Sequence, residues 1–214
     1  YNKWVLRKTF LVFLGRYSLS ENNTANSEIL VLEKPEDEEE FFIYLGNNLD
    51  NNGRHKLRSL FEFIQKPISV VIEHHYVDKV FRDSYYTYFS SKHFDTPRNC
   101  KRLSFFEGND IEYDDFLSTE GHLKLQQKFL GFSVIKPLSP GCIGRTLIDP
   151  KKLSIPRSYI RTTPFSVVIL GAKLFVDSFP FSSQDTETMT CAETTVWTLL
   201  EYFSTRYPDY KAVY

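Results

Sequence analysis

The sequence predicts an α+β protein, and three observations lead to that prediction. Apolar runs rich in β-branched and aromatic residues are typical of strands, and stretches with apolar residues at helical spacing separate them. The two kinds of element follow each other irregularly, without the strict alternation of a doubly wound parallel sheet. Hydrophobic residues make up 42% of the 214 residues, which is enough to bury a core. We expect a mixed α+β module over residues 1–170 and the start of a second domain at 171–214.

The first elements expected are a strand at residues 4–14 and a second strand at 68–72. Between them, apolar residues at helical spacing over 57–64 predict an amphipathic helix that ends before Pro67. The acidic run at residues 33–40 has two interpretations. It is either an acidic docking patch or a solvated loop or helix start favoured by the helix dipole.

Further along the chain, the spacing of apolar residues and the turn residues predict six more segments. In order, these are a helix at 76–90, an irregular stretch at 94–109, a short helix at 118–128, a strand at 129–135, a turn-rich loop at 138–144 and a short strand at 145–148. Two strands, 165–170 and 172–176, then flank Gly171, which predicts a bulge or a bend.

Composition excludes several classes of function. The 26 Lys and Arg residues and 27 Asp and Glu residues give a net charge of −1, so we expect no nucleic-acid partner. No apolar run reaches the ~20 residues of a membrane-spanning helix, so we expect no membrane association. The three cysteines are odd in number and widely spaced, which favours a reducing compartment, and we expect a cytoplasmic protein. No motif indicates a cofactor or a metal.

The most informative stretch surrounds Cys191. Thr190 and Glu193 fit a capping box, and apolar residues behind them predict a helix from Cys191 to about Thr205. A thiol at the first helical position lies among unpaired backbone N–H groups, which favour the thiolate and stabilise an oxyanion formed after attack. The nearby Glu193 carboxylate opposes the thiolate. Gln184, seven residues upstream, is a neutral donor suited to an oxyanion hole.

Two interpretations of these residues stay open on spacing alone. In the first, Cys191 is an activated nucleophile and Gln184 is its oxyanion donor. In the second, Cys191 is a small buried residue at a helix start and Gln184 is an ordinary loop residue.

A glutamine several residues before a cysteine that opens an apolar helix resembles the nucleophile segment of papain-like cysteine peptidases. The segment, about residues 179–203, is especially similar to the peptidase domains of bacteriocin exporters and related bacterial papain-fold proteins. The resemblance implies a hydrolase of the thiol protease kind, in which Cys191 is the nucleophile and Gln184 the oxyanion donor. It also implies that the α+β module is followed by the nucleophile helix of a papain-like domain. The family often has Gly or Ser beside the cysteine, where this chain has Ala192 and Glu193.

The catalytic histidine of that family follows the cysteine, and residues 192–214 contain no His. Three explanations remain: the histidine lies beyond Tyr214, the domain is not a peptidase, or an upstream histidine serves in a permuted arrangement. The chain starts at Tyr1 without an initiator Met, and we expect both ends to be cuts through a longer protein.

Glu73, His74 and His75 at the end of a predicted strand form the other cluster of chemically active side chains. With Asp78 they are half of a metal site or ordinary structural residues. Adjacent strand residues point to opposite faces, so the two histidines need a turn to bind one ion. Their role stays open.

The alternative to an enzyme is a non-catalytic α+β binding or regulatory module that recognises a protein partner. In both cases the partner or substrate is a peptide or a protein, and the sequence does not determine the oligomeric state.

Overall fold

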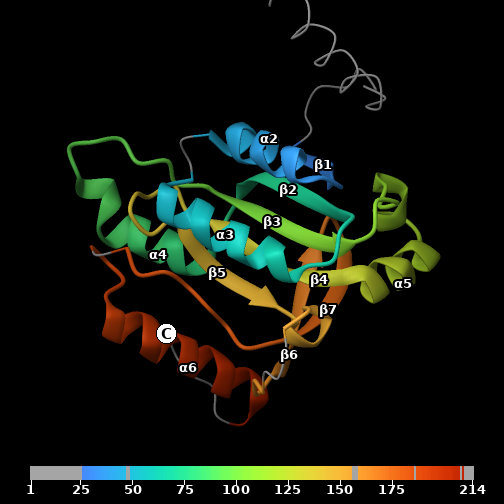
Figure 1. Ribbon diagram of the computed structural model, residues 1–214. Helices are drawn as coiled ribbons and strands as arrows, with labels where there is room; N and C mark the ends of the chain where they lie inside the picture. The colour runs from blue at the N-terminus through green and yellow to red at the C-terminus, as the bar shows by residue number, and fades with distance from the viewer. Residues whose placement is uncertain (1–25, 47–48, 156–158, 186, 208, 210–214) are drawn as a thin grey trace, which may run out of the picture.

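The computed structural model describes residues 26–46, 49–155, 159–185, 187–207 and 209 (Figure 1). They form a five-stranded antiparallel sheet, a separate two-stranded hairpin and helices that cover both, so the α+β prediction is confirmed. The strand expected at residues 4–14 lies outside the described residues.

The main sheet has the order β1-β2-β3-β4-β5, and each neighbouring pair is antiparallel. Its strands are β1 (Ser27–Leu32), β2 (Ile68–Tyr76), β3 (Cys100–Glu107), β4 (Phe129–Ile135) and β5 (Ile143–Ile148). The hairpin consists of β6 (Thr163–Ile169) and β7 (Ala172–Ser178). The α-helices are α2 (Pro35–Leu45), α3 (Asn51–Phe63), α4 (Lys79–Thr87), α5 (Thr119–Lys128) and α6 (Cys191–Arg206). Three short 3₁₀ helices are η2 (Phe89–Ser91), η3 (Tyr113–Phe116) and η4 (Pro150–Lys152).

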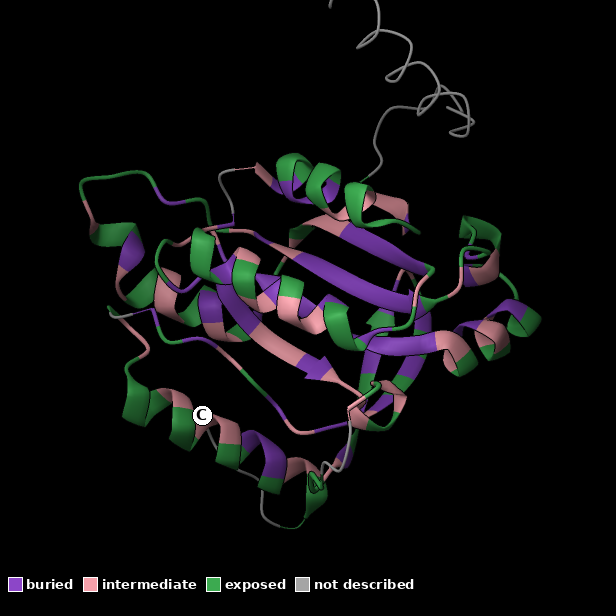
Figure 2. Ribbon diagram, in the orientation of Figure 1, coloured by how far each residue is buried: buried purple, intermediate pink, exposed green. Residues whose placement is uncertain are grey.

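The sheet separates two apolar cores, because side chains alternate between the faces of a strand. On β2, Val70 and Ile72 pack in the core beneath α2 and α3. Val71, between them, packs in the opposite core with residues of α4, α5 and the β6–β7 hairpin. Figure 2 shows that buried residues dominate the central strands, whereas exposed residues line the outer sides of α2 and α6. The sheet is therefore covered on both faces.

The β6–β7 hairpin shows the two-residue period of a strand with one buried face. Leu170 and Gly171 join the strands, and both have positive φ values, as the tight turn of a hairpin requires. Gly171 therefore occupies a hairpin turn, where the sequence predicted a bulge or a bend. The domain boundary expected after residue 170 falls at this turn, and the division into two units stays a prediction.

Two sequence interpretations are decided by the fold. The acidic run forms the start of α2, where the Asp37 carboxylate accepts hydrogen bonds from the backbone N–H groups of Glu33 and Lys34. The helix-start interpretation is therefore confirmed.

The prediction of an irregular stretch at 94–109 was wrong, because this stretch contains β3, the central strand of the sheet. Charged residues interrupt the apolar pattern of β3 and hid the strand.

Arg102 on β3 is the buried charge responsible for that interruption. Only 5% of the residue is exposed, and its guanidinium pairs with Glu73 on β2. It also donates a hydrogen bond of 2.7 Å to the carbonyl oxygen of Val168 on β6 and lies 4.4 Å from the ring centre of Tyr76. One side chain thus links the main sheet to the hairpin that covers it.

We predict that Arg102→Met lowers the free energy of unfolding by about 3–5 kcal/mol, because it leaves the Glu73 carboxylate unpaired at a poorly hydrated position. Arg58→Met is the matched control, since the Arg58–Glu39 pair is largely exposed, and it costs at most about 1 kcal/mol. Urea denaturation of the two variants measures both values. Equal losses in the two variants would contradict a structural role for the buried charge.

Candidate active site

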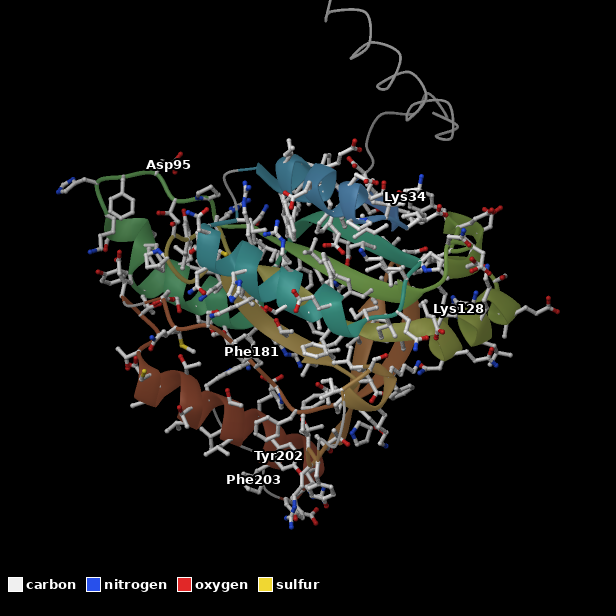
Figure 3. The ribbon with its side chains drawn as sticks, in the orientation of Figure 1. Lys34, Asp95, Lys128, Phe181, Tyr202 and Phe203 are labelled. Atoms are coloured by element: carbon white, nitrogen blue, oxygen red, sulfur yellow. The ribbon has the colours of Figure 1, made fainter. Side chains whose placement is uncertain are left out.

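The segment after β7 runs along the free edge of β5. Phe181 and Thr146 exchange two backbone hydrogen bonds of 2.8 and 3.0 Å, and the N–H of Ser183 donates to the carbonyl oxygen of Ile143 at 2.9 Å. Figure 3 labels Phe181 on this segment between the sheet and α6. A Cβ at Gly141 would lie 2.2 Å from the carbonyl oxygen of Gln184, so the close approach requires glycine at this position. The backbone of Gln184 is therefore fixed by the sheet.

Asp185 then turns the chain toward α6. Its carboxylate accepts hydrogen bonds from the backbone N–H groups of Thr188 and Met189, each at 2.8 Å, and from that of Glu187 at 3.1 Å. The Asp185 N–H donates to the carbonyl oxygen of Met189 and closes the turn. An aspartate that binds the following backbone in this way is a common turn device. It sets the direction from which the chain enters the helix.

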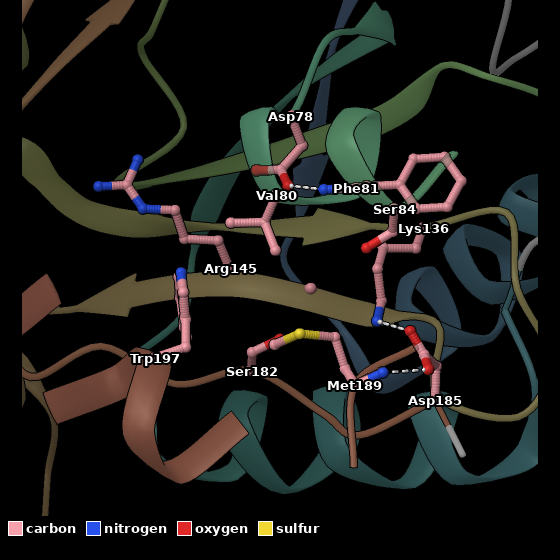
Figure 4. Close-up of a pocket in the computed structure, with 11 residues that line it drawn as sticks. Asp78, Val80, Phe81, Ser84, Lys136, Arg145, Ser182, Asp185, Met189 and Trp197 are labelled. Atoms are coloured by element: carbon pink, nitrogen blue, oxygen red, sulfur yellow. Dashed lines mark hydrogen bonds and ion pairs between the residues drawn. The ribbon is translucent and has the colours of Figure 1, made fainter. Parts of the chain in front are cut away.

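Lys136, at the end of β4, fixes Asp185 from the other side. Its Nζ lies 3.4 Å from Oδ2 of Asp185, and both side chains are almost completely buried. Figure 4 shows this pair beside a small cavity with Trp197 of α6 on its opposite wall. The cavity holds about 10 Å³, which is room for about one water molecule and no substrate.

The same contacts determine the charge of Asp185. Burial acts to raise the pKa of this carboxyl group, but the N–H groups of Met189 and Thr188 and the Lys136 ammonium outweigh burial and lower the pKa below its ordinary value. Asp185 is therefore ionised at neutral pH, and the buried cation and anion balance.

The turn places Cys191 at the first position of α6, a helix of 16 residues that begins and ends as the sequence predicted to within one residue. Thr190 is the N-cap residue, and its backbone N–H donates to the Glu193 carboxylate at 2.8 Å. The Cys191 thiol donates to Oε1 of Gln184 at an Sγ–O distance of 2.7 Å. The two residues singled out in the sequence are thus in direct contact.

Cys191 is exposed, in contrast to the other two thiols. The interpretation of Cys191 as a buried residue at a helix start is therefore wrong. Burial raises the pKa of Cys100 far above its ordinary range and raises that of Cys142 to about 11. Both buried thiols are therefore inert at neutral pH.

Two features of the site limit its chemistry. The hydrogen bonds from Thr190 lower the pKa of Glu193, so a carboxylate charge stands two residues after Cys191, at the helix start where an oxyanion would form. In addition, the carbonyl oxygen of the Gln184 amide faces Sγ. A half-turn about the last side-chain bond exchanges that oxygen for the NH₂ group, which is the group an oxyanion needs.

The histidines make their contacts elsewhere. His74 Nε2 lies 3.3 Å from Glu28, His75 Nδ1 lies 3.5 Å from Asn99, and His122 Nε2 lies 2.9 Å from the carbonyl oxygen of Phe116. In the part of the chain that the structure describes, no hydrogen bond joins a histidine to Cys191. The same residues contain no group of three or more His, Cys, Asp or Glu side chains that could hold a metal ion. Glu73 pairs with Arg102.

The inner face of α6 is anchored and its outer face is apolar and exposed. Arg145 on β5 donates to the buried Glu201 at 2.6 Å, and the ring of Tyr202 packs 5.0 Å from that of Phe179. Figure 3 shows Tyr202 and Phe203 near the end of the helix. A groove of about 410 Å³ lies along α6, and Glu193, Val196 and Leu200 are among the residues that line it.

Sequence reasoning missed Asp185 and Lys136 as parts of the site. A local signal existed for Asp185, because an aspartate followed by threonines before a helix is typical of a side-chain-to-backbone turn. A lone lysine directly after a strand with a single polar residue, Ser133, was the signal for Lys136. Their separation of 49 positions in the sequence concealed the pairing.

Comparison with known proteins found no matching protein-family model, no significantly similar curated protein and no significantly similar solved structure. Among the described helices, none is both long and apolar enough to cross a membrane.

We predict that iodoacetamide modifies Cys191 before the other two cysteines at neutral pH, because only this thiol is exposed. Peptide mapping of partly modified protein measures the three rates. Cys191→Ser is the control and should leave almost no fast-reacting thiol. Faster modification of Cys100 or Cys142 would contradict the burial described above.

We predict that Asp185→Asn lowers the free energy of unfolding at pH 7 by about 3–5 kcal/mol, since it leaves the Lys136 charge buried and unpaired. The folded-state pKa of Asp185 is lowered, so its contribution is complete above the unfolded-state pKa of about 3.9 and is lost as pH falls through the folded-state value. The difference between wild type and variant should therefore shrink below about pH 4. Urea denaturation between pH 3 and pH 7 tests this, and a difference independent of pH would count against the ion pair.

Proposed function

We propose that this chain carries the nucleophile of a papain-like thiol hydrolase, a cysteine peptidase or amidase, with Cys191 as the nucleophile and Gln184 as the oxyanion donor. The single observation that supports this function best is the contact between the exposed Cys191 thiol and the Gln184 side chain at the start of a long helix. The other thiols are buried and have raised pKa values, so they do not compete for the role.

In the proposed reaction, the Cys191 sulfur attacks the carbonyl carbon of a peptide or amide and a carbon–sulfur bond forms. The carbonyl oxygen becomes an oxyanion, which the backbone N–H of Cys191 and the NH₂ group of Gln184 stabilise. The carbon–nitrogen bond then breaks, and the leaving amine takes a proton. Water hydrolyses the thioester and releases the acid and the free thiol.

The reaction needs a general base that also returns the proton to the leaving amine. The five histidines of the sequence are all described, and no hydrogen bond joins any of them to Cys191. The proposal therefore assigns the base to a histidine outside these 214 residues. The open groove along α6, whose lining includes Ala192, Val196 and Leu200, is where the structure that carries this histidine would pack.

A peptide or protein is the proposed substrate, because the net charge of −1 gives no electrostatic basis for nucleic-acid binding. We also propose a cytoplasmic location. An exposed free thiol at Cys191 is stable in a reducing compartment and is open to oxidation elsewhere.

The second candidate is a non-catalytic module that binds a protein through α6. It is favoured by the apolar side chains on the outer face of the helix, of which Val196 is 54% and Phe203 48% exposed. In that case Cys191 has no acyl-transfer activity with any base.

An activated ester separates these two functions, because nitrophenolate leaves without needing a proton. We predict that p-nitrophenyl acetate acetylates Cys191 and that added imidazole, acting as the missing base, speeds turnover by at least about tenfold. Nitrophenolate absorbance gives the rate, and mass spectrometry of peptides locates the acetyl group. Peptide amides should give no measurable turnover under the same conditions.

Imidazole also hydrolyses this ester directly, so Cys191→Ala supplies the background to subtract. Gln184→Ala should keep the thiol and lower the remaining rate by about 10²–10³-fold. Acetylation at sites other than Cys191, or an imidazole effect that persists in Cys191→Ala, would rule out the hydrolase and favour the binding module.

A further inference from the structure

A second hollow lies away from Cys191, at the end of the sheet where β2 finishes and β3 begins. It has a volume of about 270 Å³, and four basic side chains line it: His74 and His75 from β2, Arg98 from the preceding loop and Lys101 from β3. The fifth polar residue in its lining is Asn99. No Asp or Glu side chain is part of this lining.

The two histidines share this hollow because of an irregularity in the sheet. The pairing of β2 with β3 shifts register between Glu73 and Tyr76, so the strict alternation of faces is broken at His74 and His75. Both side chains consequently reach the same cavity. His74 is already held by the Glu28 carboxylate on β1, whereas the side chain of His75 has, among the described residues, a single long hydrogen bond of 3.5 Å, with Asn99.

Lys101 has no direct ion pair with the described residues. It is only partly exposed, and the residues that the structure describes give it neither a hydrogen bond nor an ion pair. Burial lowers the pKa of its ammonium group, and the more distant Glu28 only partly offsets this. Arg98 on the loop likewise has no hydrogen bond or ion pair with the described residues. Two positively charged side chains therefore face one cavity, and neither has an ion pair among the described residues.

We propose that this hollow binds a small phosphate monoester, with Lys101 and Arg98 holding the phosphate group and the apolar wall of Ile135 and Pro137 contacting the ester's organic part. A phosphate dianion supplies the ion pairs that Lys101 and Arg98 lack among the described residues, and His75 and Asn99 offer further N–H donors to its oxygens. The lack of carboxylates in the lining argues against a metal cation.

The size of the cavity argues for a small molecule. With a volume of about 270 Å³, the hollow is far larger than the one-water cavity of about 10 Å³ beside Lys136, and it has room for a phosphate and a ring or a short chain. A nucleic-acid strand would need a basic surface that extends well beyond one hollow, and the net charge of the chain is −1. This site does not depend on the proposed hydrolase function.

Isothermal titration calorimetry of the 214-residue chain with phenyl phosphate, inorganic phosphate and phenol tests the proposal. Phenyl phosphate should bind more tightly than inorganic phosphate, and phenol should show no binding, because the charge anchors the ligand and the ring adds apolar contact. Lys101→Met should weaken phenyl phosphate binding by about 10- to 100-fold, the loss expected for one charge-assisted hydrogen bond. Arg98→Gln should weaken binding in the same direction.

Lys173→Met is the matched control, since Lys173 is exposed on β7 and loses the same charge. Lys173→Met should change the affinity for phenyl phosphate by less than about twofold, because solvent and salt screen a charge that lies far from the hollow. Circular dichroism verifies that each variant is folded. If Lys101→Met does not fold, the exposed Arg98 provides the deciding variant.

Three results would overturn the proposal: no binding of either phosphate at millimolar concentration, equal weakening by Lys101→Met and Lys173→Met, or binding of phenol as tight as that of phenyl phosphate. A separate experiment measures binding of the chain to phosphatidylcholine vesicles that contain phosphatidic acid. Binding to these vesicles without binding of soluble phenyl phosphate would assign the basic residues to a lipid surface and contradict a small-molecule site.

Discussion

The buried ion pair between Lys136 and Asp185 determines where Cys191 lies. Removing two charges from water is costly. Such a pair is therefore stable only where hydrogen bonds satisfy the polar atoms that the ion pair itself leaves unbonded. Here three backbone N–H groups after Asp185 satisfy its carboxylate, and they belong to the turn that leads into α6. Lys136 is fixed at the end of a wholly buried strand. The sheet thus sets the position of Asp185, Asp185 shapes the turn, and the turn sets the first residue of the helix.

This connection explains why a rigid scaffold can present an exposed thiol. Backbone hydrogen bonds between Phe181 and Thr146 hold the approach segment to β5, and the Arg145–Glu201 pair holds the far part of α6. The helix is therefore fixed at both ends of its inner face, while the Cys191 end faces solvent. Such a fixed frame is what nucleophilic catalysis needs, because the attacking atom must be positioned before the substrate arrives. The outer face of α6 carries exposed apolar side chains.

The parts of the fold that depend on local sequence were predictable. The capping box at Thr190 and Glu193 defined the start of α6, and alternating or continuous apolar residues defined β4 and the hairpin. The central strand β3 was missed because Arg102 finds its partner, Glu73, on another strand 29 residues away. The Lys136–Asp185 pair was missed for the same reason, since it spans 49 residues. The alternation rule placed His74 and His75 on opposite faces, and a register shift that depends on pairing with β3 brings them to one hollow.

Amide hydrogen exchange at Thr188 and Met189 tests most directly whether the ion pair holds the turn before Cys191. Both N–H groups donate to Asp185, and opening of the turn exposes them without unfolding the sheet. In Lys136→Met their exchange should become at least about tenfold faster than in wild type, while the amides of β3 keep their protection. Unchanged exchange at Thr188 and Met189, or an equal acceleration throughout β3, would contradict the account.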